Sequence, residues 1–150
     1  DVYKRQGGYQ SINDLVCEGG RLRRQRDLAY ELITAIPGVT CVKPQAALYM
    51  FPRLDPDVYP IEDDRQFFLQ LLEATRVMLV QGTGFNWSRP DHFRIVFLPH
   101  EPDLRIAIGR IAKFLEDYRA KQGKKLPGSA GAEPVKGAVA SPVELAVDAD

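Results

Sequence analysis

The chain has 150 residues, 45% of them hydrophobic and 27% charged, which is the composition of a single globular domain. Its 20 basic and 20 acidic residues leave no net charge, so neither a nucleic acid nor a membrane surface is indicated as a partner. Two cysteines and two histidines are too few for a disulfide scaffold, or for a metal site without carboxylate support.

The first predicted element is a helix over 21–36, because apolar residues recur there at three- and four-residue spacing until Pro37 and Gly38 end the pattern. Two strands are predicted next, over 39–42 and 46–51, with a short turn between them. Strands that lie so close in sequence favour antiparallel pairing with each other.

A loop rich in aspartate and proline is expected over 53–60, followed by a helix over 63–75 whose acidic first turn suits the positive end of the helix dipole. The continuous apolar run 77–80 predicts a strand that is covered on both faces and ends in a glycine turn over 81–85. A second apolar strand is predicted over 93–98, where Pro99 closes it.

The last predicted helix spans 101–119 and carries one apolar stripe, made of Leu104, Ile108, Ile111, Leu115 and Tyr118. Residues 121–150 consist mainly of small residues and proline without aromatics, so we expect a disordered tail. The order of the elements predicts an α/β (α+β) fold, a two-layer sandwich in which helices pack on one face of a mixed β-sheet.

Arg94 is the chemically suspicious residue, because it shares a face of the otherwise apolar strand 93–98 with Val96 and Leu98. Burying a guanidinium is unfavourable unless an anion meets it, and its planar fork fits a carboxylate through two parallel hydrogen bonds. Arg94 is therefore a candidate ligand for the carboxylate of an amino acid or keto acid. A structural ion pair, or a place at the exposed end of the strand, is the alternative.

The glycine turn and its neighbours give weaker signals. Gly82 and Gly84 form an ordinary turn or allow a backbone to approach a ligand, and they lack the spacing of a phosphate loop. Trp87 is either a cover for a neighbouring domain or subunit, or a local anchor of the loop. Asp63 and Asp64 are most simply the start of a helix, and no nucleophile constellation emerges.

Several segments taken together are more specific than any one of them: Gly7–Ile12 with Gly19–Leu22, Ile36–Pro44 with Ala47–Pro52, Leu79–Trp87, and Asp91–Pro99. In this order, over about Gly7 to Ala120, the chain resembles class I pyridoxal-phosphate-dependent aminotransferases of the bacterial alanine (glutamate–pyruvate) type. Glu18 and Gly84 depart from the family's pattern, which usually has proline and alanine at these places.

The resemblance implies that residues 7–120 form the small C-terminal domain of a fold-type I enzyme, which closes over the active site. It implies a cytoplasmic, homodimeric parent that uses pyridoxal 5'-phosphate to exchange an amino group between alanine and 2-oxoglutarate, giving pyruvate and glutamate. Its partners would be an amino acid, a 2-oxo acid and the upstream large domain. In the family, the arginine at the position of Arg94 binds the substrate's α-carboxylate, in agreement with the reasoning from the residues alone.

The family's attachment lysine lies in an S-x-x-K motif, and no serine of this chain is followed by lysine at that spacing. The resemblance places this lysine and most cofactor ligands upstream of Gly7. We therefore expect no catalytic, cofactor-binding or metal-binding residue here, an inactive chain on its own, and surface positions for Lys43 and Lys113. The start at Asp1, without methionine, indicates that residues 1–6 are a non-native or extraneous start.

Two readings from other functional classes remain open at this point. An aminotransferase-like domain can also end a transcription regulator that only senses the cofactor, in which case a helix-turn-helix would lie far upstream. The chain could also be a free-standing, non-catalytic α/β interaction module.

Overall fold

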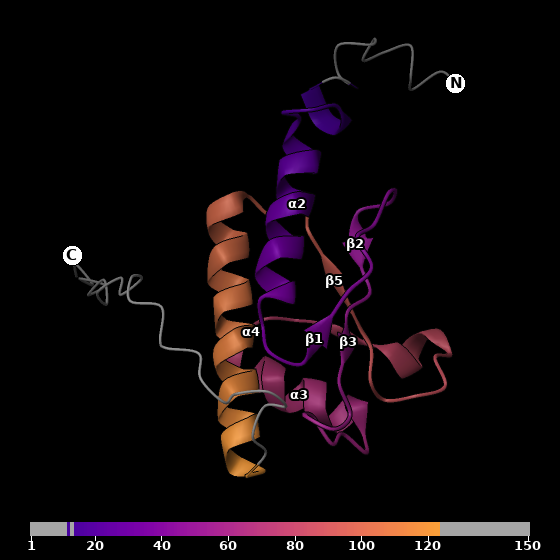
Figure 1. Cartoon of the computed structure of the whole chain (residues 1–150), viewed down its shortest axis with the longest axis vertical. Coiled ribbons are helices and arrows are strands. Elements are labelled where there is room, and N and C mark those ends of the chain that lie inside the picture. The colour runs from indigo at the N-terminus through magenta and orange to yellow at the C-terminus, as the bar shows by residue number, and fades with distance from the viewer. Residues whose placement is uncertain (1–11, 13, 124–150) are drawn as a thin grey trace, which may run out of the picture.

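The computed structural model describes residue 12 and residues 14–123; the predicted start over 1–6 and the predicted tail beyond residue 123 lie outside the described residues. Figure 1 shows the elements of this part in chain order: α2 (Arg21–Thr34), β1 (Val39–Thr40), β2 (Tyr49–Met50), β3 (Arg53–Leu54), α3 (Asp64–Thr75), β4 (Val80–Gln81), the 3-10 turn η1 (Gly82–Phe85), β5 (Phe93–Val96) and α4 (Glu101–Lys121).

The three helices follow the prediction to within two residues at each end. Asp63 precedes α3 and its carboxylate accepts a hydrogen bond from the backbone N–H of Gln66 at 3.1 Å, so it caps the helix. The helix ends where Arg76 adopts a left-handed conformation with φ 59°. Among the described residues, no helix is both long and apolar enough to cross a bilayer.

The strands form two short antiparallel sheets in the described part of the chain, where we expected one mixed sheet. One has the order β2–β5–β4 and the other pairs β1 with β3. The predicted pairing of the strands 39–42 and 46–51 is therefore wrong. Residues 41–48 between them form no strand and bend over 45–48, so the segment is longer than a tight hairpin turn and β2 begins only at Tyr49.

Two smaller predictions about strands also fail. Arg53 and Leu54, expected in a loop, form β3, where Leu54 is buried and its N–H donates to the carbonyl of Asp91 at 2.7 Å. The run 77–80 is not a strand covered on both faces, because Met78 is 77% exposed and pairing starts at Val80. Residues 76–79 after α3 belong to no helix or strand, and the chain reaches a partner strand only at Val80.

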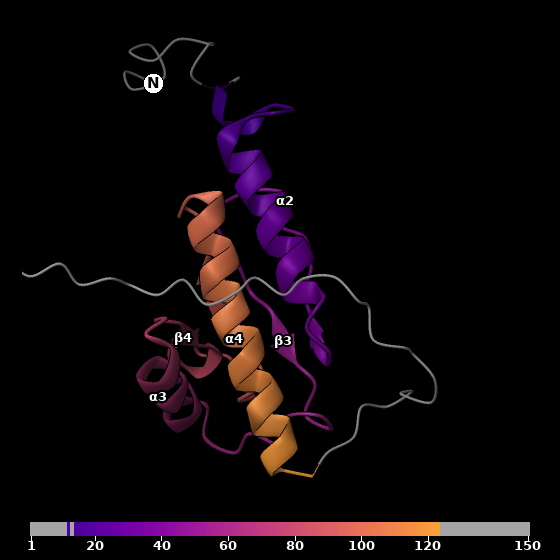
Figure 2. The same ribbon diagram turned by 90° about the vertical axis from the view of Figure 1, so that its left-hand side faces the viewer.

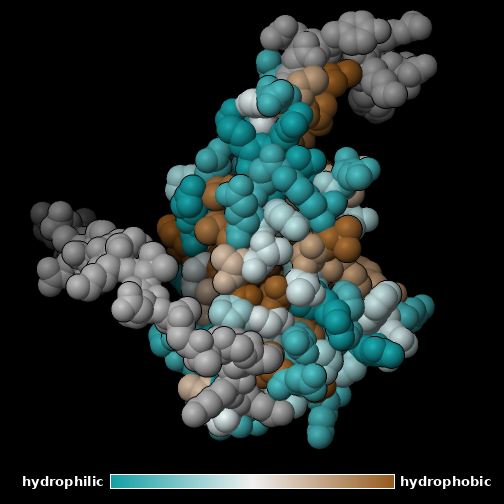
Figure 3. Space-filling view, in the orientation of Figure 1, coloured by the Kyte–Doolittle hydropathy of each residue, from teal (hydrophilic) through white to brown (hydrophobic). Residues whose placement is uncertain are grey.

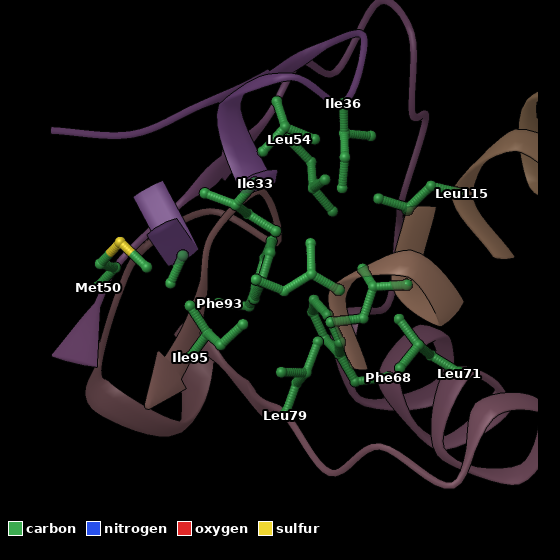
Figure 4. Packing of buried hydrophobic residues seen from close by; sticks show 14 of the residues in the cluster. Ile33, Ile36, Met50, Leu54, Phe68, Leu71, Leu79, Phe93, Ile95 and Leu115 are labelled. Atoms are coloured by element: carbon green, nitrogen blue, oxygen red, sulfur yellow. The ribbon is translucent and has the colours of Figure 1, made fainter. Parts of the chain in front are cut away.

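The predicted two-layer α/β arrangement is confirmed. In Figures 1 and 2, α2 and α4 lie side by side along one face of the strands, and α3 lies beside the lower part of α4. Figure 4 shows the core between the layers, where Phe93 and Ile95 of β5 meet the helices. The predicted stripe of α4 is buried at four of its five positions, Leu104, Ile108, Ile111 and Leu115, and Tyr118 is partly buried.

The outward side of α2 is polar. In Figure 3, hydrophilic side chains gather along this helix, in agreement with the exposed positions of Arg21, Arg23 and Arg24. The opposite side of the helix buries Ala29 and Ile33, so α2 is amphipathic as its spacing predicted. The helices thus cover one face of the three-stranded sheet. Arg94 of β5 lies on the other face.

Candidate functional site

Arg94 projects from the face of the three-stranded sheet that lies opposite the helices. Its neighbours Phe93 and Ile95 are buried in the core, and side chains alternate along a strand, so Arg94 and Val96 point the other way. Val96 is 40% exposed and Arg94 is half-buried. Because β5 is the central strand, Arg94 lies in the middle of this face and not at an exposed strand end.

Two aromatic rings hold the guanidinium of Arg94. Its Cζ lies 4.7 Å from the ring centroid of Phe85 and 5.7 Å from that of Tyr49, within the range of cation–π attraction. Its Nε is buried and has no hydrogen-bond partner among the described residues. Buried N–H groups are nearly always paired in a complete site, so this arrangement is suited to accept a carboxylate.

A structural ion pair was the alternative explanation of Arg94. The ion pairs seen among the described residues join other groups, including Arg24 with Glu101 and Arg53 with Asp91. Among the described residues, none of the ion pairs includes Arg94. The geometry therefore favours an external anion over an internal carboxylate as the group that meets Arg94.

The turn η1, which carries Phe85, is fixed by a buried carboxylate. Asp64 is 3% exposed, and it accepts hydrogen bonds from the backbone N–H of Thr83 at 3.1 Å and from its hydroxyl at 2.7 Å. We expected both Asp63 and Asp64 only to mark the start of a helix. This describes Asp63, whereas Asp64 also holds η1. The sequence carried no signal for the role of Asp64, because acidic residues in a first helical turn are ordinary.

Gly82 and Gly84 differ in what they do. The N–H of Gly82 donates to the carbonyl of His92 at 2.8 Å, and an added Cβ would lie 2.8 Å from the same oxygen. Gly82 therefore permits a close approach of two backbone segments, whereas a Cβ at Gly84 would meet Gln81 at an ordinary 3.7 Å. Of the two explanations for this turn, local packing is the one that the contacts at Gly82 support.

A second buried carboxylate lies beneath the loop that follows η1. Asp91 is 5% exposed, and its oxygens accept hydrogen bonds from Arg53 Nε at 3.2 Å, Trp87 Nε1 at 3.0 Å and His92 Nδ1 at 2.6 Å. Trp87 is thus a local anchor of the loop, one of its two expected roles. An ionised carboxylate can only accept hydrogen bonds, so Nδ1 of His92 must be the donor and carries the ring's proton.

Burial alone would raise the pKa of Asp91, but the hydrogen bonds from His92, Trp87 and Arg53 outweigh it and hold the pKa below the ordinary 3.8. A carboxyl whose pKa is lowered on folding stabilises the fold above the unfolded-state pKa, and this stabilisation is lost as the pH falls through the folded-state pKa.

We expect Asp91→Asn to lower the free energy of unfolding at pH 7 by about 2 kcal/mol, the magnitude of hydrogen bonds to a charged group. The difference between the two proteins should shrink as the pH is lowered from 7 through the folded-state pKa of Asp91, where its carboxylate becomes protonated. Urea unfolding of the wild-type chain and the variant across this range measures it. A difference that is the same at both ends would show that the charge of Asp91 is not involved.

The lysines considered in the sequence occupy the surface, as expected. Lys43 pairs with Asp27 at 2.9 Å, and Lys113 pairs with Asp117 at 2.7 Å, with side chains 45% and 68% exposed. In the described part of the chain, no group of three or more histidine, cysteine or acidic residues could hold a metal ion.

The chain is similar to known proteins of one family. A family model described as aminotransferase class I and II matches residues 11–111. Over 113 residues the chain is 58% identical to an alanine aminotransferase of Mycobacterium tuberculosis, and the match covers 75% of this chain and 26% of that protein. It is 53% identical over 112 residues to the glutamate–pyruvate aminotransferase of Escherichia coli K12, covering 75% of this chain and 28% of that one.

A solved structure shows the same fold. The crystal structure of an aminotransferase from Escherichia coli superposes with a TM-score of 0.72 at 52% identity, and covers 75% of this chain and 28% of that chain. The chain thus spans 26–28% of the length of these relatives.

Proposed function

The chain belongs to the class I and II aminotransferase family, and from this premise we propose that it is the C-terminal part of an alanine aminotransferase. The reaction would transfer the amino group of alanine to 2-oxoglutarate, giving pyruvate and glutamate. Members of this family depend on pyridoxal phosphate, which supplies the electron sink for the transfer. We further propose that residues 7–120 are the small domain of a cytoplasmic homodimer.

One observation supports a substrate-binding role above the others, namely Arg94 held between Phe85 and Tyr49 with its Nε unpartnered. A guanidinium binds a carboxylate through two parallel hydrogen bonds, which fixes the orientation of the bound molecule as well as its place. In the proposed reaction, Arg94 neutralises and orients the α-carboxylate, and it takes no part in proton transfer.

The same residue can serve both halves of the reaction. Alanine, pyruvate, 2-oxoglutarate and glutamate each carry a carboxylate bonded directly to the reacting carbon. A single arginine on a paired central strand therefore gives all four molecules a common anchor, which places each reacting carbon at the same distance from Arg94. The attachment of the cofactor, and the group that moves the proton, belong to the upstream part of the enzyme in this proposal.

The proposal can be tested by joining residues 7–123 of this chain to the upstream region of the Escherichia coli relative; we call the product the fused enzyme. We expect it to transfer amino groups from alanine to 2-oxoglutarate with a turnover on the order of 1–1000 per second. The same fusion carrying Arg94→Ala is the control, in which transfer should be lost.

A folded, cofactor-binding fused enzyme that transfers no amino group would contradict the proposal. It would favour the other two readings, a domain that senses the cofactor in a transcription regulator or a non-catalytic interaction module, because both keep the fold without the reaction.

A further inference from the structure

Four aromatic rings lie next to one another beside Arg94. Phe51 stacks on His92 with ring centroids 5.0 Å apart, and it meets Trp87 edge-on at 5.7 Å and Phe85 edge-on at 6.3 Å. Trp87 and His92 are also in contact, at 4.5 Å. Because Phe85 lies over Arg94, this ring cluster extends from the guanidinium to the loop that follows η1.

The ring cluster rests on the carboxylate of Asp91. Two of its four members, Trp87 and His92, donate hydrogen bonds to Asp91, and the third donor, Arg53, comes from another strand. Asp91 thus joins β3, the loop after η1 and the start of β5 at one buried point. A buried carboxylate with three donors fixes the orientation of their planes more tightly than apolar packing does, because each hydrogen bond is directional.

We infer that Asp91 is a positioning residue for substrate binding: it fixes Trp87 and His92, and through Phe51 and Phe85 it holds the guanidinium of Arg94 in the orientation that receives a carboxylate. This inference rests on the proposed function of Arg94. In this inference Asp91 acts on Arg94 indirectly, through Trp87, Phe51 and Phe85.

The strength of the effect follows from how Arg94 is held. The guanidinium has no hydrogen bond at Nε to keep it in place before a ligand arrives, so its orientation depends on Phe85 and Tyr49. If Phe85 shifts, the guanidinium can adopt other rotamers. Binding of a carboxylate must then order the side chain, and this loss of conformational entropy weakens the binding. Small displacements of a group that orients a substrate are known to lower rates by up to about 100-fold.

The test uses Asp91→Asn in the fused enzyme, with Asp117→Asn as the matched control at an exposed aspartate of α4. We expect Asp91→Asn to lower kcat/KM for both alanine and 2-oxoglutarate about tenfold, mainly by raising KM, at a temperature well below unfolding. Asp117→Asn should leave both constants unchanged. Melting temperatures recorded on the same samples separate a loss of folded enzyme from a loss of binding.

A double-mutant cycle tests the path from Asp91 to Arg94. In the background of Phe85→Leu, Asp91→Asn should lower kcat/KM less than about threefold, because the ring that transmits its effect is already gone. A full tenfold loss in both backgrounds would show that Asp91 does not act through Phe85. Kinetics of Asp91→Asn equal to the wild type, with only the melting temperature lowered, would reduce Asp91 to a purely structural residue.

Two further measurements keep the outcomes distinct. Arg94→Lys with unchanged kinetics would overturn the proposed function itself, whereas a strong loss in Arg94→Lys without one in Asp91→Asn would overturn only the present inference. If Asp91→Asn prevents folding of the fused enzyme, the inference is tested instead by NMR spectroscopy on the 150-residue chain. In that chain, Trp87→Phe removes one hydrogen-bond donor to Asp91. The 15N–1H chemical shift of Arg94 Nε should therefore differ between the variant and the wild type. An unchanged chemical shift would contradict the inference.

Discussion

Arg94→Lys in the fused enzyme is expected to lower kcat/KM for alanine and for 2-oxoglutarate about 100-fold. Lysine keeps the positive charge but offers a point charge in place of the two-pronged fork, so one charge-assisted hydrogen bond and its directionality are lost. Such a bond contributes about 1.5–3 kcal/mol, and each 1.4 kcal/mol is a factor of ten in rate. Most of the loss should appear as a higher KM, since the carboxylate is bound before the chemistry begins.

The matched control is Arg105→Lys, the same substitution at an exposed arginine of α4. Its kinetic constants should equal those of the unaltered fused enzyme. Steady-state rates over a range of alanine and 2-oxoglutarate concentrations measure both variants. If Arg94→Lys behaves like its control, Arg94 does not bind the α-carboxylate.

Leu71→Ala is expected to destabilise the 150-residue chain by about 3 kcal/mol, because removing a buried leucine leaves a cavity in addition to the lost transfer free energy. Leu71 is 1% exposed and lies in the core between α3 and its neighbours. Leu69 lies two positions earlier on the same helix and is 47% exposed. Leu69→Ala makes the same chemical change without a cavity and should cost less than about 1 kcal/mol.

Urea unfolding followed by circular dichroism gives both free energies on the same scale. Equal effects of the two substitutions would mean that the packing of α3 against the rest of the domain is not as the structure describes it. A large effect of Leu69→Ala alone would point to an apolar contact on the outer side of α3.

The helices were predictable because the signal for a helix is local. In α4 the spacing of Leu104, Ile108, Ile111 and Leu115 already defines the buried side, and the charges at its two ends agree with the dipole. The pairing of strands is a different matter. β1 and β2 are neighbours in sequence, yet β1 pairs with β3 and β2 pairs with β5. Each strand has only two residues, and this is too short a pattern to predict which strand it pairs with.

The candidate site was half predictable for a related reason. Arg94 stood out because a single charge in an apolar strand breaks the local pattern. Asp64 and Asp91 did not, since an aspartate in a first helical turn or just before a strand is an ordinary choice for an exposed position. Their burial, and the hydrogen bonds that compensate for it, arise only when distant segments come together.

The placement of β5 between β2 and β4 has a consequence for how the site fluctuates. Amide protons of a strand that is paired on both edges and backed by the core exchange with solvent mainly through opening of the whole domain, whereas a four-residue turn such as η1 can open locally. Arg94 belongs to the first class and Phe85 to the second. The backbone amide of Arg94 should therefore exchange only when the whole domain opens, whereas that of Phe85 should exchange faster, once the hydrogen bonds that join Thr83 to Asp64 break.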